Sequence, residues 1–138
     1  MKKIPLVSII DDDQLFQFST KKLLESTEGV EEILQFKNGQ EAINYFLDNR
    51  DRPEKIPDLV FLDLNMPVSN GWDFLDKFTS HTFEKNLITI YICTSTDSKY
   101  DHEKLNLYPE LKGFLFKPII KQEVFEVLDD ELGKSESI

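Results

Sequence analysis

The sequence contains almost no cysteine, little histidine and no long apolar run. Cys93 is the only cysteine among 138 residues, so an intramolecular disulfide is excluded and a reducing compartment is favoured. One cysteine and two histidines also argue against a zinc site built from these ligands. No apolar stretch reaches the roughly 18 residues of a membrane span, and the short one after Met1-Lys2-Lys3 does not suit a signal peptide. We therefore expect a cytoplasmic protein with no membrane partner.

Basic residues are scarce relative to acidic ones. The chain has 16 lysines and arginines against 26 aspartates and glutamates, which is a formal net charge of −10. This balance disfavours nonspecific nucleic-acid binding, which needs a basic surface, so we expect no nucleic-acid partner. The length suits one domain that buries roughly 70% of its unfolded surface. We expect one folded domain over residues 1–132, followed by a polar C-terminal tail over 133–138.

Short apolar runs alternate with segments of helical periodicity along the chain. The runs at 6–10, 32–36, 58–63, 87–93 and 113–116 predict strands. Four consecutive apolar residues within 58–63 are typical of a strand covered on both faces of its sheet. The alternation predicts an α/β protein, a doubly wound sandwich with a five-stranded parallel sheet. The fourth helix, expected over 98–106, has poor apolar periodicity and is predicted only because a parallel crossover needs a covering element.

Polar side chains follow four of the five predicted strands. Asp11 and Asp12 come after the first strand, Asp63 ends the third, and Thr94 and Lys117 follow the fourth and fifth. Ligands of open α/β sheets bind beyond the carboxyl ends of the strands, so we expect these side chains to converge. Two carboxylates about 4 Å apart repel by about 4 kcal/mol at an effective dielectric near 20. A hard divalent cation relieves this repulsion, and a site with only oxygen ligands suits Mg²⁺.

Phosphoryl transfer is the chemistry that this combination favours. An aspartate beside Mg²⁺ can act as a nucleophile toward phosphorus, while a lysine and a threonine contact phosphate oxygens. Each residue also has a structural interpretation: residues 11–13 can cap a helix, as we expect for Asp13, and Lys117-Pro118 can form a turn. These explanations suffice one at a time, but they do not explain why suitable residues follow the strands in order.

Four short motifs combine these residues: Ile10-Asp11-Asp12-Asp13, Leu62-Asp63-Leu64-Asn65-Met66-Pro67, Thr94-Ser95 and Phe116-Lys117-Pro118. Through them the chain resembles the response-regulator receiver domain, the phosphoacceptor module of two-component signalling, over about residues 4–131. The resemblance implies a flavodoxin-like (βα)5 fold with the strand order 2-1-3-4-5.

The resemblance also implies roles for the acidic residues. Asp63 is expected to accept a phosphoryl group from a histidine kinase or a histidine phosphotransfer protein. Asp63, Asp12 and the main-chain carbonyl of Asn65 are expected to bind Mg²⁺ directly, and Asp11 mostly through water. The acyl phosphate is expected to hydrolyse slowly, so the protein would be a signalling phosphoacceptor with weak self-dephosphorylation rather than an enzyme.

The remaining motif residues are expected to sense the phosphoryl group. By resemblance, Lys117 contacts it and is followed by a cis proline, while Thr94 and Phe114 form the conformational switch. Phe114 has no hydroxyl, unlike the tyrosine found in other members, so its inward state gains no hydrogen bond. Since little sequence follows the last predicted helix, we expect a single-domain regulator. Its output would be an unknown protein partner or onward phosphotransfer.

Three alternatives compete with this interpretation. A phosphohydrolase of the haloacid dehalogenase type needs a second aspartate two residues after the nucleophile, where this chain has Asn65. A flavodoxin-like cofactor module needs a Ser/Thr/Gly-rich phosphate loop after the first strand, where this chain has three aspartates. A receiver that no longer turns over phosphate would act as a constitutive binding partner, which the intact set of site residues disfavours.

Overall fold

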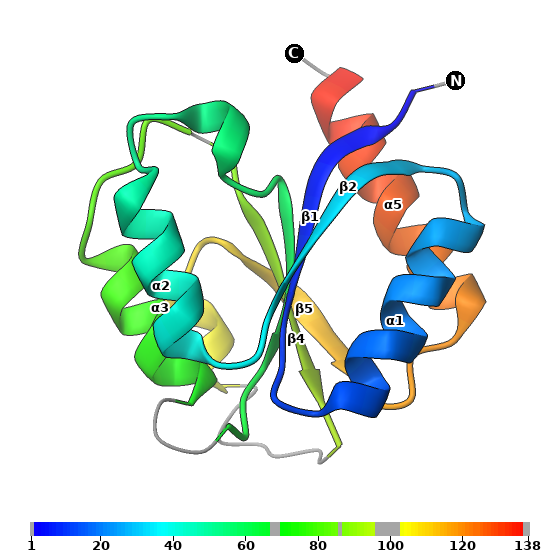
Figure 1. Ribbon diagram of the computed structural model, residues 1–138, viewed down its shortest axis with the longest axis horizontal. Coiled ribbons are helices and arrows are strands. Elements are labelled where there is room, and N and C mark those ends of the chain that lie inside the picture. Colours follow the sequence, from blue (N-terminus) through cyan, green and yellow to red (C-terminus); the bar gives the residue numbers. More distant parts are fainter. Residues whose placement is uncertain (1, 67–69, 86, 96–102, 137–138) are drawn as a thin grey trace.

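The computed structural model describes residues 2–66, 70–85, 87–95 and 103–136 (Figure 1). Strands and helices alternate along the chain: β1 (Ile4–Ile10), α1 (Gln14–Ser26), β2 (Val30–Phe36), α2 (Gly39–Asp48), β3 (Leu59–Asp63), α3 (Gly71–Thr79), β4 (Thr89–Thr94), β5 (Leu111–Phe116) and α5 (Lys121–Glu136). Two short 3-10 helices, η1 (Pro53–Lys55) and η2 (Leu105–Leu107), lie in the connections. Within the described residues, no helix is both long and apolar enough to cross a membrane.

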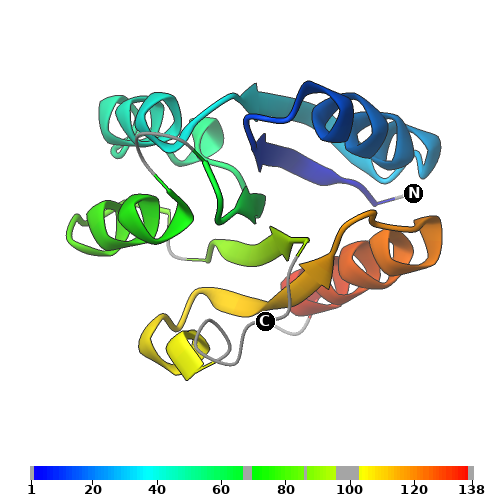
Figure 2. The same cartoon turned by 90° about the horizontal axis from the view of Figure 1, so that it is seen from below.

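The five strands form one parallel sheet in the order β2-β1-β3-β4-β5, as predicted. Helices α1 and α5 cover one face of the sheet, and α2 and α3 cover the other (Figures 1 and 2). The predicted flavodoxin-like sandwich is therefore confirmed. Parallel strands leave their carboxyl ends at one edge of the sheet, toward which Figure 2 looks from below.

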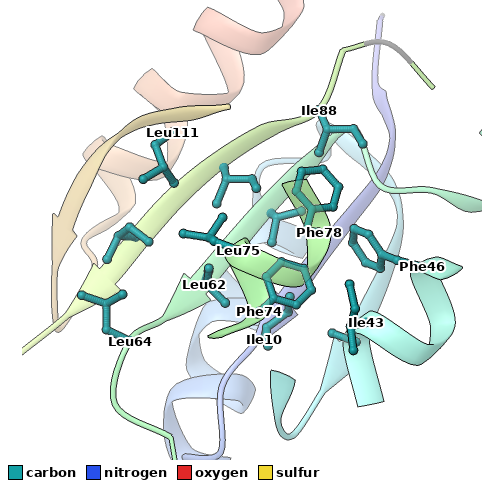
Figure 3. Close-up of a cluster of buried hydrophobic side chains, with 14 of the residues drawn as sticks. Ile10, Ile43, Phe46, Leu62, Leu64, Phe74, Leu75, Phe78, Ile88 and Leu111 are labelled. Carbon is teal, nitrogen blue, oxygen red and sulfur yellow. The ribbon is translucent and has the colours of Figure 1, made fainter. Parts of the chain in front are cut away.

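Strand β3 shows why its sequence is continuously apolar. Leu59 and Phe61 pack into the core under α1 and α5, whereas Val60 and Leu62 pack into the core under α2 and α3. Successive strand residues point to opposite faces, so a sheet covered on both sides needs apolar residues at every position. Figure 3 shows the second core, in which the Phe46 ring meets the Phe74 ring edge-on at 5.5 Å between centroids.

Side-chain caps start the helices that follow the first three strands. The Asp13 carboxylate accepts hydrogen bonds from the N–H groups of Leu15 and Phe16 at the start of α1, which confirms its expected capping role. Asn38 caps α2 in the same way, and Asn70 forms a reciprocal capping box at α3. Each cap fixes the residue at which its helix begins.

Several predicted boundaries differ from the structure. Strand β5 begins at Leu111 rather than at residue 113, and β4 begins at Thr89 rather than at residue 87. Helix α5 continues through Gly133 to Glu136, into the segment predicted to be a polar tail. A glycine inside a helix costs only about 1 kcal/mol relative to alanine and does not break it. Most of the helix expected over 98–106 lies outside the described residues; the part that is described includes the 3-10 helix η2.

Candidate functional site

The strand register brings the predicted site residues to one level at the carboxyl edge of the sheet. Ile10 pairs with Leu62, so the next residues along β1 and β3, Asp11 and Asp63, lie side by side. Asp63 in turn pairs with Cys93, the neighbour of Thr94 at the end of β4. The convergence predicted from the sequence is therefore a consequence of register.

One oxygen from each of Asp11, Asp12 and Asp63 lies within 4.8 Å of the others. Asp11 and Asp63 are only 1% and 4% exposed, while Asp12 is exposed at the rim. Carboxylates that share such a small space suit a hard cation with oxygen ligands, so this donor set fits Mg²⁺. Asn65 follows closely and is exposed, and its N–H donates to Asp63 Oδ1 at 3.3 Å.

Lys117 provides positive charge inside this acidic group. Its Nζ lies 2.8 Å from Asp11 Oδ2 and 3.5 Å from Asp63 Oδ1. Burial by itself would lower the pKa of Lys117, but the hydrogen bond and charge of Asp11, together with Asp63, raise it. The ammonium therefore stays charged and offers a point charge for an anion bound at Asp63.

The surroundings of Asp11 disfavour the ionised form of its carboxyl group. The pKa of the Asp11 carboxyl is raised from 3.8 to about 6, chiefly by burial and also by the nearby Asp63 charge. The hydrogen bond from Lys117 and the N–H of Asp13, which donates to Asp11 Oδ1 at 2.9 Å, act in the opposite direction. The acidic group is thus destabilised electrostatically, as expected of a site that gains from binding a cation.

The two predicted switch residues lie on the neighbouring strands β4 and β5. Thr94 is 2% exposed and ends β4, and its carbonyl accepts the N–H of Lys117 at 2.9 Å. Phe114 on β5 pairs with Ile92 and is partly buried against the core under α2 and α3. The Lys117-Pro118 peptide bond is cis, as the resemblance predicts.

Cys93 precedes Thr94 on β4 and pairs with Asp63. It is fully buried, and burial raises the pKa of its thiol. The thiolate is the reactive form of cysteine, so this side chain belongs to the core rather than to the chemistry of the site.

Two residues that support the site escaped the sequence analysis as functional positions. A Cβ added to Gly71 would lie 2.5 Å from the main-chain oxygen of Asp63, so the start of α3 packs directly against the loop after β3. The centroid of the Phe16 ring on α1 lies 4.4 Å from Lys117 Nζ, so the ring faces this cation. The sequence offers no signal for either contact, because both join segments that are distant along the chain.

The comparisons with known proteins agree with this geometry. The family model described as Response regulator receiver domain matches residues 7–129. The nitrate/nitrite response regulator protein NarL of Escherichia coli (strain K12) is 26% identical over 122 residues, which cover 88% of this chain and 52% of NarL. A protein-glutamate methylesterase/protein-glutamine glutaminase of Clostridium acetobutylicum is 29% identical over 94% of this chain and 35% of its own length. The chain thus spans about half the length of NarL and about a third of the length of the methylesterase/glutaminase.

Solved structures show the same similarity. A two component response regulator from Cytophaga hutchinsonii has a TM-score of 0.85 and 28% identity, over 96% of this chain and 99% of that one. A CheY-like response regulator receiver domain protein from Methanospirillum hungatei shares the fold with a TM-score of 0.73 at 22% identity, over 97% of this chain and 98% of that one. Since the family model covers nearly the whole described domain, the chain belongs to the response regulator receiver domain family.

Proposed function

We propose that this protein is a response regulator that accepts a phosphoryl group on Asp63 from a histidine kinase or a histidine phosphotransfer protein. Receiver domains are the phosphoacceptors of two-component signalling, and this chain matches that domain. The observation that supports the assignment to Asp63 is that its buried carboxylate shares one ammonium with the buried carboxylate of Asp11. Lys117 Nζ lies 3.5 Å from Asp63 Oδ1 and 2.8 Å from Asp11 Oδ2.

In the proposed reaction, an Asp63 oxygen attacks phosphorus while the bond from phosphorus to the donor imidazole nitrogen breaks. The imidazole leaves with the electron pair of that bond, and an acyl phosphate forms on Asp63. Lys117 would follow the transferring group, exchanging part of its contact with Asp11 for a phosphoryl oxygen. The Thr94 hydroxyl, at the end of the neighbouring strand, is the proposed donor to a second oxygen.

Receiver domains bind Mg²⁺ in an acidic pocket, and the carboxylates of Asp11, Asp12 and Asp63 form such a group here. We propose that Asp12, Asp63 and the carbonyl of Asn65 hold Mg²⁺ directly and that Asp11 acts mainly through water. When bound, the ion neutralises charge on the transferring phosphoryl group. The raised pKa of Asp11 supports the need for such a cation.

The signal is proposed to leave through a change in protein contacts or through onward phosphotransfer. Thr94 and Phe114 lie on adjacent strands, and Phe114 is partly buried, so a change in its ring position would alter the surface of β5. A downstream partner protein would then recognise the face near β5 and α5. Amide hydrogen exchange of the free and phosphorylated protein over 97–106 and 111–116 would test this route. Unchanged protection in both segments would contradict it.

Incubation with Mg²⁺ and a small acyl-phosphate donor tests the central proposal. Mass spectrometry should show the addition of one phosphoryl group, which is lost in Asp63→Asn and without Mg²⁺. Asp13→Asn is the matched control, because it removes a neighbouring carboxylate while asparagine remains a good helix cap. Its phosphorylation should persist. Phosphorylation of Asp63→Asn at the wild-type level, or sustained turnover of a phosphate ester, would refute the assignment.

A second arm identifies the donor class. A phosphorylated histidine phosphotransfer protein should pass its phosphoryl group to wild-type protein and to Asp13→Asn, but not to Asp63→Asn. Transfer from acyl phosphate but from no histidine donor would contradict the partner assignment and leave the phosphoacceptor assignment standing.

A further inference from the structure

The side chain of Gln17 on α1 joins α1 to the loop that carries the acidic residues. Its amide nitrogen lies within hydrogen-bond distance of three main-chain oxygens: Ile9 at 3.1 Å, Asp11 at 3.0 Å and Phe36 at 2.9 Å. The Phe36 oxygen also accepts the N–H of Asp11 at 3.0 Å. One amide group therefore bridges the ends of β1 and β2 at the point where the chain turns into the acidic loop.

The position of this amide explains what it does. Strand β2 ends at Phe36 and β1 ends at Ile10, so Asp11 lies one residue beyond the regular strand. There the Gln17 amide donates a hydrogen bond to the Asp11 carbonyl, in place of the backbone N–H that a longer β2 would provide. A buried carbonyl needs such a donor, because an unsatisfied polar group is costly away from water.

A second glutamine orients the first. The Gln35 amide nitrogen donates to Gln17 Oε1 at 3.0 Å and lies 3.3 Å from the Gln17 main-chain oxygen. An amide has one acceptor and one donor end, so this contact keeps the nitrogen of Gln17 turned toward the three carbonyls. The Gln17 side chain is half-buried, at the wall of an open groove of about 790 Å³ between α1 and the start of α2.

We propose that Gln17 is a positioning residue for the divalent-cation site. It acts through the main chain of Asp11, which fixes the direction of the Asp11 and Asp12 carboxylates toward Asp63. The inference rests on the proposed function, since it assumes that these carboxylates bind Mg²⁺. Groups that orient metal ligands without touching the metal typically change affinity by 10-fold to 100-fold when they are removed. Gln17 should therefore influence Mg²⁺ affinity more than its place on a helix surface suggests.

Titration calorimetry with Mg²⁺ on the folded full chain tests the proposal. Gln17→Met has a similar length but no donor, and it should weaken Mg²⁺ binding about tenfold. Gln17→Lys again provides N–H donors on a long side chain and should recover most of this loss. The controls are Gln14→Met and Gln14→Lys, because Gln14 lies exposed on the first turn of the same helix and lines the same groove. Gln14→Met corrects the Mg²⁺ affinity for the loss of a surface amide, and Gln14→Lys corrects it for the added positive charge.

The possible results separate this inference from the proposed function. If wild-type protein binds no Mg²⁺, both fail. If it binds Mg²⁺ and Gln17→Met binds within twofold of it, only the positioning role is overturned. Equal weakening of Gln17→Met and Gln17→Lys, after correction by the Gln14 variants, also overturns it. If Gln17→Met does not fold, the Mg²⁺ affinity of Gln35→Met is measured instead. This exposed substitution removes the donor to Gln17 Oε1 and should also weaken Mg²⁺ binding. Wild-type affinity in Gln35→Met would then refute the role of Gln17.

Discussion

Replacement of Asp11 by asparagine tests the electrostatic state of the site without any phosphoryl donor. The carboxyl has a pKa of 3.8 when solvated and about 6 in the folded protein, with burial as the largest cause. At about 1.36 kcal/mol for each pH unit, this difference corresponds to about 3 kcal/mol. The folded state binds this proton more tightly than the unfolded state does. Protonation of Asp11 therefore stabilises the folded protein fully below pH 3.8, and this stabilisation is lost as the pH rises through about 6.

The variant should therefore become more stable relative to wild type as the pH rises. The two pKa values predict that its relative free energy of unfolding increases by about 1.4 kcal/mol between pH 5 and pH 8. A change across pH is a better measure than one value, because altered packing of the amide contributes equally at every pH. Urea unfolding at several pH values, in buffer with a chelator, gives the required free energies.

Asp12→Asn is the matched control, because it removes a charge from the same loop at an exposed position. Its stability is measured at the same pH values, to correct for the loss of a charge from this loop. The reasoning is refuted if Asp11→Asn shows no increase in relative stability between pH 5 and pH 8, or a decrease. Added Mg²⁺ should stabilise wild-type protein more than Asp11→Asn, since the ion offsets the repulsion that the variant no longer has.

Three further substitutions test other contacts. Gly71→Ala places a carbon 2.5 Å from the main-chain oxygen of Asp63, so phosphorylation by the acyl-phosphate donor should slow. Gly133→Ala is the control, because its added carbon has no atom within 4 Å and should not change the rate. Equal rates for the two variants would contradict this prediction. Phe16→Leu removes a ring face from Lys117, worth about 0.5–2 kcal/mol, so phosphorylation should slow by twofold to thirtyfold; a wild-type rate would exclude a role for the ring. Phe46→Ala should lower the free energy of unfolding by about 3–5 kcal/mol in urea, and a loss below 1 kcal/mol would show that the aromatic core repacks.

The sequence alone determined the fold class and the place of the site. The fully apolar run before Asp63 predicts a strand buried on both faces, and such strands need helices on both sides. Because parallel strands end at the same edge, the residue types that follow them are brought together by topology. Asp11, Asp63 and Lys117 could therefore be identified before any distance was known.

Only the tertiary structure decided how this site is supported. Gln17 looks like an ordinary surface residue of a helix, and its contacts with Ile9 and Phe36 depend on how α1 lies across two strand ends. Gly71 and Phe16 similarly gain their roles from close approaches between segments distant along the chain. Local patterns record which side chains prefer a helix, a strand or a cap. Contacts between separate elements depend on the packing of the whole domain, which no local pattern contains.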